Sequence, residues 1–324
     1  MIKAEYAVVI VTYNREVLLR ECVSQVEKQT VPASKIIVVN NSSTDGTTAY
    51  LEALTKHNGV YHMIECSRNL GGAGGFARGL ACAMNYSVDC VLLIDDDAML
   101  SVDYMEKLLA ARDKKPQYGA FAGCVQVDGK LDTNHRKNFS KVGMLFKNCR
   151  EALYQNDYFV CETASFCGML VDKIIIDKIG LPNAEYFILH DDVEYSIRIN
   201  QLSKFLVVSN AILHHKTERQ AVKHYPRRYD WHDYYAVRNR IWYVMEHGTV
   251  LDRLVNGVDL FLRVIFRNWV FGLIKRDGYD WQYEKAITKA AIKDAHVSKE
   301  KKYIQLKIRV SEGYHNERAL KGNF

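Results

Sequence analysis

The sequence predicts an α/β protein built on a doubly wound sheet, followed by a helical region at the C-terminal end. Two observations lead to this prediction. Apolar runs of strand length alternate with helix-like segments in the first part of the chain, which is typical of a doubly wound sheet. After Tyr225 the chain becomes aromatic, basic and helical in pattern. We therefore expect a first domain at residues 1–225 and a helical region at residues 226–324.

Four strands are predicted in the N-terminal part, each of them an apolar run that leads into polar residues. The first is YAVVIVTYN (residues 6–14), which is rich in β-branched residues and long enough for a buried strand. The others are KIIVVNNSSTDGT (residues 35–47), GVYHMIECSRN (residues 59–69) and CVLLIDDD (residues 90–97). In a parallel arrangement, their polar ends meet at one edge of the sheet.

Helices are expected between these strands. One is predicted at residues 15–29, because five apolar side chains fall on a single face. These side chains are Val17, Leu18, Cys22, Val23 and Val26. Ser43, Thr44 or Asp45 is expected to cap the next helix. LGGAGGFARGLACAMNY (residues 70–86) is a glycine-rich turn that enters a third helix.

The second part of the chain has a less regular pattern. Irregular strands and loops are expected at residues 120–159, and a strand with a short helix at residues 162–181. Residues 185–203 lead through an acidic cluster into a helix, and residues 205–217 form a strand that ends in two histidines. Helices are predicted at residues 227–248 and 250–277 from their apolar and aromatic pattern.

Three consecutive carboxylates, Asp95, Asp96 and Asp97, end the fourth predicted strand. Like charges side by side repel, so solvent, a divalent cation or the donors of a bound ligand must neutralise them. Asp95 and Asp97 are two residues apart and therefore lean toward the same rim of the sheet. Residues 40–45 and the glycine turn fall at this same edge, which indicates a binding site there.

The second acidic cluster is HDDVE, residues 190–194. Asp191, Asp192 and Glu194 would offset the dipole at a helix N-terminus, or one of them would serve as a general base. The presence of two acidic clusters and a histidine pair at predicted element ends favours the second interpretation. His214 or His215 is a candidate ligand for Mn²⁺ or Mg²⁺, and strand alternation predicts that only one of them binds.

The glycine turn has an alternative interpretation. Gly72, Gly74 and Ala77 fit the dinucleotide-binding pattern G-x-G-x-x-G/A, and carboxylates follow about 20 residues later. An NAD(P)-dependent oxidoreductase is therefore a rival. Against it, the turn follows the third predicted strand, and a single ribose-binding acid does not require three aspartates.

Taken together, the motifs resemble the inverting nucleotide-sugar glycosyltransferases of family 2, which have the GT-A fold. The matching segments are VVIVTYNRE, VVNNSSTDGT, LLIDDDA, LHDDVEYSIR and ILHH, and the resemblance covers about residues 6–240. It implies a mixed, doubly wound sheet with a Rossmann-like nucleotide-binding half. The donor half would be about residues 1–100 and the acceptor half about residues 101–225. NLGGAGGFARG and DDDA are most similar to the galactofuranosyltransferase branch, with rhamnosyltransferases nearby.

The resemblance implies a divalent cation, Mn²⁺ or Mg²⁺, bound by Asp97 and His214. Asp192 would deprotonate the acceptor hydroxyl, and Asp191 and Glu194 would position the acceptor or support the base. A further set would bind the nucleotide sugar: Thr12, Asn41, Arg68, Arg78, Asp95 and Asp96. Many relatives have Asp where this chain has Asn40 and Asn41, so the contact with the base would be made by an amide.

The implied reaction is metal-dependent, inverting transfer of a hexose to a glycan or lipid-linked acceptor in cell-surface polysaccharide synthesis. Galactofuranose from UDP-galactofuranose is the expected donor sugar, and rhamnose from dTDP-rhamnose is the alternative. The candidate residues agree with a single-displacement reaction. This reaction needs one general base, and the sequence offers no separate, well-placed candidate nucleophile.

Composition and charge place further limits on the partners. The first 250 residues balance 29 Lys and Arg against 29 Asp and Glu, whereas residues 251–324 contain 15 and 9. The basic, apolar segment at residues 258–274 is expected to pack on the first domain or another subunit, or to lie on an anionic lipid surface. No nucleic-acid partner is expected, because no reading motif is present.

The remaining features concern the compartment. MIKAEYAVVIVTYN at the N-terminus has no signal-peptide pattern. The 8 cysteines are scattered without a CxxC pair, so reduced thiols are expected. A cytoplasmic location is predicted, with peripheral association at the inner face of the plasma membrane if the basic segment binds lipid.

Overall fold

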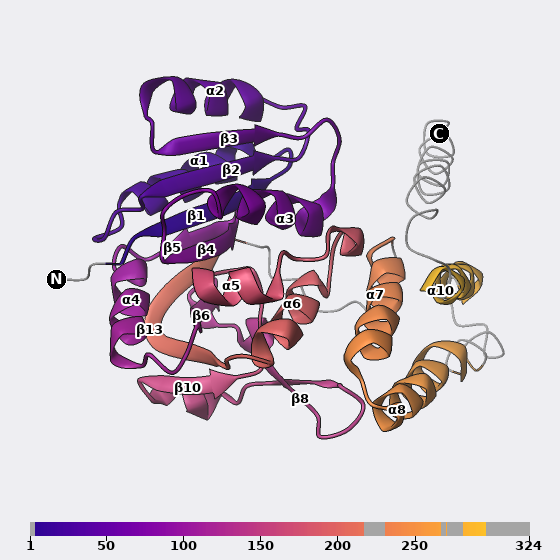
Figure 1. The fold of residues 1–324 in the computed structure, drawn as a ribbon. Coiled ribbons are helices and arrows are strands. Elements are labelled where there is room, and N and C mark those ends of the chain that lie inside the picture. The colour runs from indigo at the N-terminus through magenta and orange to yellow at the C-terminus, as the bar shows by residue number, and fades with distance from the viewer. Residues whose placement is uncertain (1–3, 217–230, 267–269, 271–280, 296–324) are drawn as a thin grey trace. The chain divides into compact units, whose positions relative to one another are not determined.

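The computed structural model describes residues 4–216, 231–266, 270 and 281–295 (Figure 1). The chain divides into two units, Met1–Val222 and Lys223–Phe324. The positions of these units relative to one another are not determined, so each is described by itself.

Four parallel strands form one half of the main sheet in the first unit. They are β1 (Tyr6–Thr12), β2 (Lys35–Asn40), β3 (Tyr61–Glu65) and β4 (Cys90–Asp95), in the order β3-β2-β1-β4. All four lie within segments predicted as strands. Register brings Thr12 opposite Asn40 and Val11 opposite Asp95. The polar strand ends therefore share one edge of the sheet, as the sequence predicted.

The other half of the sheet is mixed. β12 (Met169–Asp172) is antiparallel to both β4 and β6 (Ala120–Val127), and β13 (Phe205–His215) is parallel to β6. β10 (Tyr158–Cys161) pairs with β13. Two short strands, β5 (Ala98–Leu100) and β7 (Lys130–Leu131), pair with β13 and β6. The result is a mixed, doubly wound sheet.

The expectation of irregular structure at residues 120–159 is wrong for β6, which is a regular strand of 8 residues. Its sequence, AFAGCVQV, contains small residues with weak strand preference. Pairing with a neighbour on each side and burial of almost every side chain determine its conformation instead. Tertiary contacts thus override the local pattern here.

Helices cover both faces of the sheet. On one face lie α1 (Glu16–Glu27), α2 (Thr47–His57) and α4 (Tyr104–Lys114). On the other lie α3 (Gly71–Ala83), α5 (Lys173–Ile179) and α6 (Asp191–Asn200). In α1, Leu19 is buried with Cys22, Val23 and Val26, while Val17 is 80% exposed. The prediction that Val17 belongs to the buried face is therefore wrong.

The glycines of α3 allow this helix to pack directly against the strands. A Cβ at Gly75 would lie 2.5 Å from Val11 Cγ1, and a Cβ at Gly79 would lie 2.3 Å from Val9 Cγ1. Gly71, the first residue of α3, has φ of +71°, where a side chain is strained. These positions require glycine for packing and for backbone geometry, which accounts for the glycine-rich sequence without a dinucleotide.

A small second sheet lies beside the main one. It consists of β11 (Thr163–Ala164), β8 (Arg136–Phe139) and β9 (Phe146–Asn148), in the order β11-β8-β9. Three 3₁₀ helices connect elements in this half of the unit: η1 (Thr133–His135), η2 (Glu151–Gln155) and η3 (Ala184–Tyr186).

The described part of the second unit is helical. It contains α7 (Trp231–His247), α8 (Val250–Leu260), the π-helix η4 (Phe261–Phe266) and α10 (Trp281–Ala295). Thr249 and Asp252 form a capping box at the start of α8. The basic, apolar segment predicted at residues 258–274 lies partly outside the described part of the chain, which here includes residues 258–266 and 270. Among the described helices, none is long and apolar enough to cross a membrane.

Candidate active site

The three aspartates at the end of β4 are held by groups from the end of β1 and the turn after it. Thr12 Oγ1 donates a hydrogen bond to Asp96 Oδ2 at 2.7 Å. Arg15 Nη1 donates to Asp96 Oδ1 at 3.2 Å and to Asp97 Oδ2 at 2.9 Å. Arg15, which the sequence analysis did not single out, therefore neutralises part of the acidic cluster. The position of Arg15 directly after the first predicted strand was the sequence feature that could have indicated this role.

A histidine at the end of β13 supplies a second positive partner. His215 Nε2 lies 3.0 Å from Asp97 Oδ1. His214, the neighbour expected to bind metal, has an exposed side chain and makes no hydrogen bond or ion pair with the aspartates among the described residues, so the geometry favours His215 for this role. The expectation that the two rings diverge agrees with their placement, because only His215 faces Asp97.

The local charges shift the pKa values of the aspartates in different directions. Burial and repulsion from its two neighbours raise the pKa of Asp95 to about 7. Burial also raises the pKa of Asp96 to about 6, although Thr12 and Arg15 oppose this shift. Burial acts the same way on Asp97, but the hydrogen bond and charge of His215 outweigh it and lower the pKa of Asp97. Asp96 and Asp97 have hydrogen-bond and ion-pair partners that offset their negative charge, whereas the Asp95 carboxylate has the weakest such stabilisation.

The second acidic cluster begins α6. His190 precedes the helix in the left-handed conformation, with φ of 64°, and so turns the chain sharply into its first residues. Asp191 is buried, and its Oδ2 lies 4.0 Å from the position of a Cβ at Gly72. Asp192 Oδ1 accepts a hydrogen bond of 2.7 Å from the backbone N–H of Val193. This contact fixes the orientation of the Asp192 carboxylate.

The two acidic clusters influence one another. Burial and the charge of Asp192 raise the pKa of Asp191 well above its usual range, and the charge of Asp95 adds to the shift. Burial raises the pKa of Asp192, against the hydrogen bond from Val193. Asp192 in turn contributes to the raised pKa of Asp95. The ends of β4 and α6, about a hundred residues apart in sequence, therefore form one site.

Glu194 is placed differently from the other two acids of α6. Its carboxylate receives two hydrogen bonds of 2.8 Å from Nε and Nη2 of Arg198, four residues further along the helix. Arg198 also donates to the carbonyl oxygens of Ile179 and Leu181 at 2.7 and 2.9 Å. Through Arg198, Glu194 ties α6 to the segment that follows α5. This supports the helix that presents Asp192.

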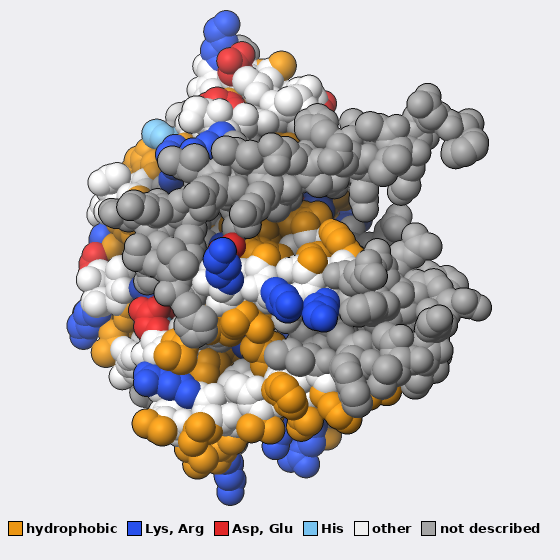
Figure 2. Space-filling view, turned by 90° about the vertical axis from the view of Figure 1, so that its right-hand side faces the viewer, with side chains coloured by type: hydrophobic (Ala, Val, Ile, Leu, Met, Phe, Trp, Pro, Cys, Tyr) orange, Lys and Arg blue, Asp and Glu red, His pale blue; other side chains and the backbone are white. Residues whose placement is uncertain are grey.

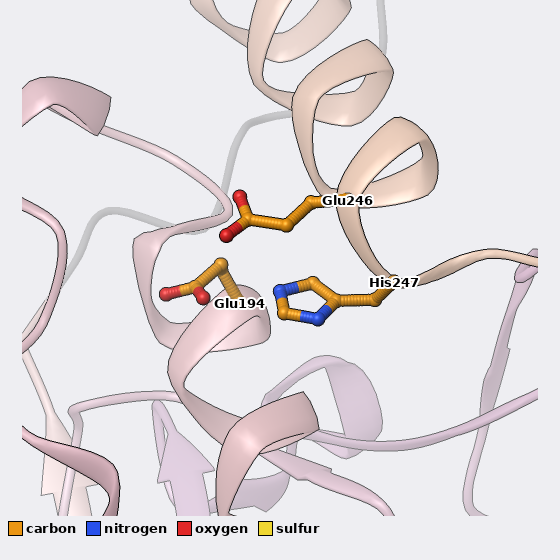
Figure 3. A group of neighbouring side chains, drawn as sticks. All are labelled: Glu194, Glu246 and His247. Carbon is orange, nitrogen blue, oxygen red and sulfur yellow. The ribbon is translucent and has the colours of Figure 1, made fainter.

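Figure 3 shows Glu194 on α6 of the first unit, and Glu246 and His247 at the end of α7 in the second. Because the relative positions of the two units are not determined, these side chains are considered within their own units. Glu194 is buried, Glu246 is exposed and His247 is half-buried.

The predicted nucleotide-binding residues have different surroundings. Asn41 is buried beside the glycine turn, where its Nδ2 donates to the Gly71 carbonyl at 2.9 Å, and its Oδ1 has no hydrogen-bond partner among the described residues. Asn40 is instead held by Thr48 and Glu65, which indicates a structural role. The other predicted members at this edge, Arg68 and Arg78, are exposed.

Two basic residues of β8 also belong to this region, and sequence reasoning missed both. Arg136 is completely buried and donates to the carbonyl oxygens of Gly123, His135 and Cys167 at 2.8–3.0 Å. The charges of Lys137 and Arg136 oppose the upward shift of the pKa of Asp192. Both residues lie in the segment expected to be irregular, where no strand alternation marked them.

The residues at the end of β4 fit a divalent cation. Asp97 and His215 present a carboxylate oxygen and an imidazole nitrogen 3.0 Å apart. Asp95 makes no side-chain hydrogen bond or ion pair among the described residues, and the repulsion that contributes to its raised pKa would be offset by a positive ion. Oxygen and imidazole ligands suit Mn²⁺, and carboxylate oxygen also suits Mg²⁺.

Comparisons with known proteins identify relatives of this chain. The sequence model of Glycosyl transferase family 2 matches residues 7–180. An uncharacterized glycosyltransferase of Haemophilus influenzae is 25% identical over 190 residues, covering 59% of this chain and 56% of that protein. Galactofuranosyltransferase GlfT1 of Mycolicibacterium smegmatis is 27% identical over 199 residues, covering 59% and 64%. The chain thus spans less than two thirds of the length of these relatives.

Solved structures share the fold. A structure of GalNAc-T7 with UDP, GalNAc and Mn²⁺ has a TM-score of 0.59 at 17% identity, covering 75% of this chain and 48% of that one. Residues 1–349 of S. aureus TarS have a TM-score of 0.56 at 14% identity, covering 90% and 80%. The GT-A fold predicted from the sequence is confirmed by these glycosyltransferase neighbours.

Proposed function

The chain belongs to glycosyl transferase family 2 and is a glycosyltransferase, and from this premise we propose a metal-dependent transfer that inverts the anomeric carbon. The galactofuranosyltransferase relatives support galactofuranose as the transferred sugar, and UDP-galactofuranose is the donor that we propose. The proposed acceptor is a glycan or lipid-linked glycan. Transfer of rhamnose from dTDP-rhamnose is the alternative. Membership in the family overturns the rival interpretation as an NAD(P)-dependent oxidoreductase.

The observation that supports this mechanism best is the coupling of the two acidic clusters. Asp95 and Asp97 lie at the end of β4 with His215, and Asp192 lies near enough to raise the pKa of Asp95. The cluster at the end of β4, with His215, is suited to the donor and its cation. The cluster at the start of α6, where the Val193 N–H holds Asp192, is suited to the acceptor. A single displacement requires this pair of functions and no covalent intermediate on the protein.

Asp192 is proposed as the general base. The Val193 N–H holds its Oδ1, and the raised pKa makes the carboxylate a stronger proton acceptor than an ordinary aspartate. It would take the proton from the acceptor hydroxyl as that oxygen attacks the sugar. Asp191 and Glu194 would position the helix and the acceptor, Glu194 through its ion pair with Arg198.

Asp97 and His215 would hold the cation, with Asp95 and Asp96 on the side of the nucleotide sugar. When bound, the cation supplies stabilisation of the negative charge on the departing diphosphate. Arg15, now between Asp96 and Asp97, is half exposed and would turn toward the diphosphate when those carboxylates are neutralised otherwise. Thr12 keeps Asp96 in place, and Asn41 would face the base with its carbonyl oxygen, which has no hydrogen-bond partner among the described residues.

The proposal is tested by a donor screen. The purified chain is supplied with Mn²⁺ and a panel of UDP- and dTDP-sugars, and released nucleotide and transferred sugar are measured by mass spectrometry. We expect activity with UDP-galactofuranose that chelation abolishes. Asp192→Asn should lower turnover by about a hundredfold or more, the size of a general-base contribution, while donor binding by calorimetry is retained.

Matched variants separate the base from the cation site. Asp97→Asn should weaken binding of UDP with Mn²⁺, whereas Asp177→Asn, an exposed acid on α5, should change neither binding nor turnover. Full activity of Asp192→Asn would remove the proposed base. Activity with dTDP-rhamnose alone would select the alternative donor, and release of no nucleotide from any donor would contradict the proposal.

A further inference from the structure

The second unit contains a helix whose polar side faces its neighbour. Arg240 of α7 donates from Nε to Asn256 Oδ1 at 2.5 Å and from Nη2 to Asp259 Oδ2 at 2.6 Å, and both acceptors belong to α8. Asn256 is 7% exposed. The amphipathic helix of a globular protein usually turns its apolar stripe toward the core. α8 has the opposite orientation.

The apolar side of this helix is open to solvent. Seven large apolar side chains of α8 and η4 are between 47% and 71% exposed, and we call them the α8 stripe: Val250, Leu251, Leu254, Val258, Phe261, Leu262 and Phe266. At about 100° per residue, the first six fall within an arc of roughly 120°. A continuous stripe of this kind marks an interaction surface more often than scattered exposed residues do.

The second unit as a whole has a surplus of positive charge. Lys223–Phe324 contains 20 Lys and Arg against 12 Asp and Glu, whereas Met1–Val222 contains 24 against 26. On α8 itself, Arg253 is exposed and donates from Nη2 to the Met245 carbonyl oxygen at 2.8 Å. Figure 2 shows hydrophobic side chains together with Lys and Arg side chains on the face that it draws.

We propose that the α8 stripe binds the surface of an anionic lipid membrane, with α8 lying parallel to the membrane plane. An apolar face on a unit with a surplus of positive charge matches the acyl boundary and the anionic headgroups of such a surface. A second copy of the chain fits less well, because pairing the stripes would bring together two units that each have a surplus of 8 positive charges. The proposal goes beyond the transfer reaction and does not depend on which sugar is transferred.

The test is cosedimentation of the full chain with lipid vesicles. Vesicles of phosphatidylglycerol mixed with phosphatidylcholine are compared with vesicles of phosphatidylcholine alone, at low and high salt. We expect binding to the anionic vesicles, weaker binding at high salt because the attraction is screened, and little binding to the neutral ones. A double variant, Leu254→Glu with Val258→Glu, should reduce the bound fraction by about tenfold or more, since it removes two anchors and adds repulsion.

The matched control places the same two charges on the first unit. Ile174 and Leu202 are 61% and 48% exposed, and Ile174→Glu with Leu202→Glu should leave vesicle binding unchanged. An unchanged melting temperature and unchanged binding of UDP with Mn²⁺ show that each variant is folded. Equal binding by the α8 variant, equal binding to neutral vesicles, or a dimer in solution that the α8 variant converts to a monomer would each overturn the proposal.

Discussion

Asp192 is subject to opposing influences that decide when it is ionised. Burial raises its pKa most, while the Val193 N–H and the charges of Lys137 and Arg136 lower it. The balance leaves the pKa above that of an ordinary aspartate. A general base accepts a proton only when ionised, so a rate that depends on Asp192 must fall as pH falls through this raised pKa. The acid side of the pH–rate profile therefore reports the surroundings of Asp192.

Lys137→Met removes one of the charges that favour ionised Asp192. The pKa of Asp192 should then rise further, and the acid limb of kcat/KM should move to higher pH by roughly half a unit to one unit. The rate at high pH, where Asp192 is ionised in both proteins, should change little. The measurement is the pH dependence of donor turnover. Lys147→Met, at an exposed position of β9, is the control and should leave the limb in place.

An acid limb that stays in place for Lys137→Met would show that Lys137 does not act on the base. A limb that moves equally for Lys147→Met would show a general charge effect in place of a local one.

The histidine pair shows how far residue-level prediction reaches. Strand alternation correctly predicted that the two side chains diverge, but not which of them faces the aspartates. β13 has an irregularity in its register between Val208 and Ile212, and such a bulge reverses the alternation that follows it. Because the bulge arises from pairing with β6, a distant segment, the sequence of β13 alone does not reveal it.

At the scale of elements, α3 depends on close approach to β1 and β2. The Cβ that Gly79 lacks would lie 2.3 Å from Val9 Cγ1 and 3.0 Å from Val39 Cγ2, both within buried strands. Side chains in a packed sheet have little room to move, so an added methyl group must shift the helix or the strands. The glycines of α3 are therefore packing residues, and their effect is on stability.

Gly79→Ala should lower the free energy of unfolding by about 1–3 kcal/mol, the usual cost of overpacking a core. Gly257→Ala, in α8, is the matched control, because its Cβ meets nothing within 4 Å. The control should be neutral or stabilise by up to about 1 kcal/mol through helix preference. Urea unfolding of both variants provides the measurement. If Gly79→Ala were as stable as the unmodified chain, the described packing of α3 on the sheet would be wrong.

Some secondary-structure elements could be predicted from the sequence and others could not. Three of the four parallel strands, β1, β2 and β4, were readable with their polar ends, because each is a continuous apolar run bounded by turn residues. β6 was not, because Ala and Gly dilute its strand pattern. Arg136 was missed with it. Its buried guanidinium is recognisable only once β8 has been placed against Gly123 and Cys167.

For the molecule as a whole, the ionised carboxylates of the acidic site repel one another and lower the stability of the folded state. The pKa values of Asp95 and Asp96 are raised to about 7 and about 6, and that of His215 is raised by its partner Asp97 in spite of burial. An unfolded aspartate has a pKa of about 4. Between these values the folded chain binds more protons than the unfolded chain, so its stability falls as pH rises. Asp97, whose pKa is lowered, acts in the opposite sense only at lower pH.

We therefore expect the metal-free chain to lose a few degrees of melting temperature between about pH 5 and pH 8, as Asp95, Asp96 and His215 lose their protons. Added Mn²⁺ should raise the melting temperature, and the increase should be larger at pH 8, where ionised carboxylates and neutral imidazole are available as ligands. Scanning fluorimetry with Mn²⁺ or a chelator measures both effects. Asp97→Asn should lose the Mn²⁺ increment, and Asp177→Asn should keep it. An increment that is independent of pH would place the cation elsewhere than at these carboxylates.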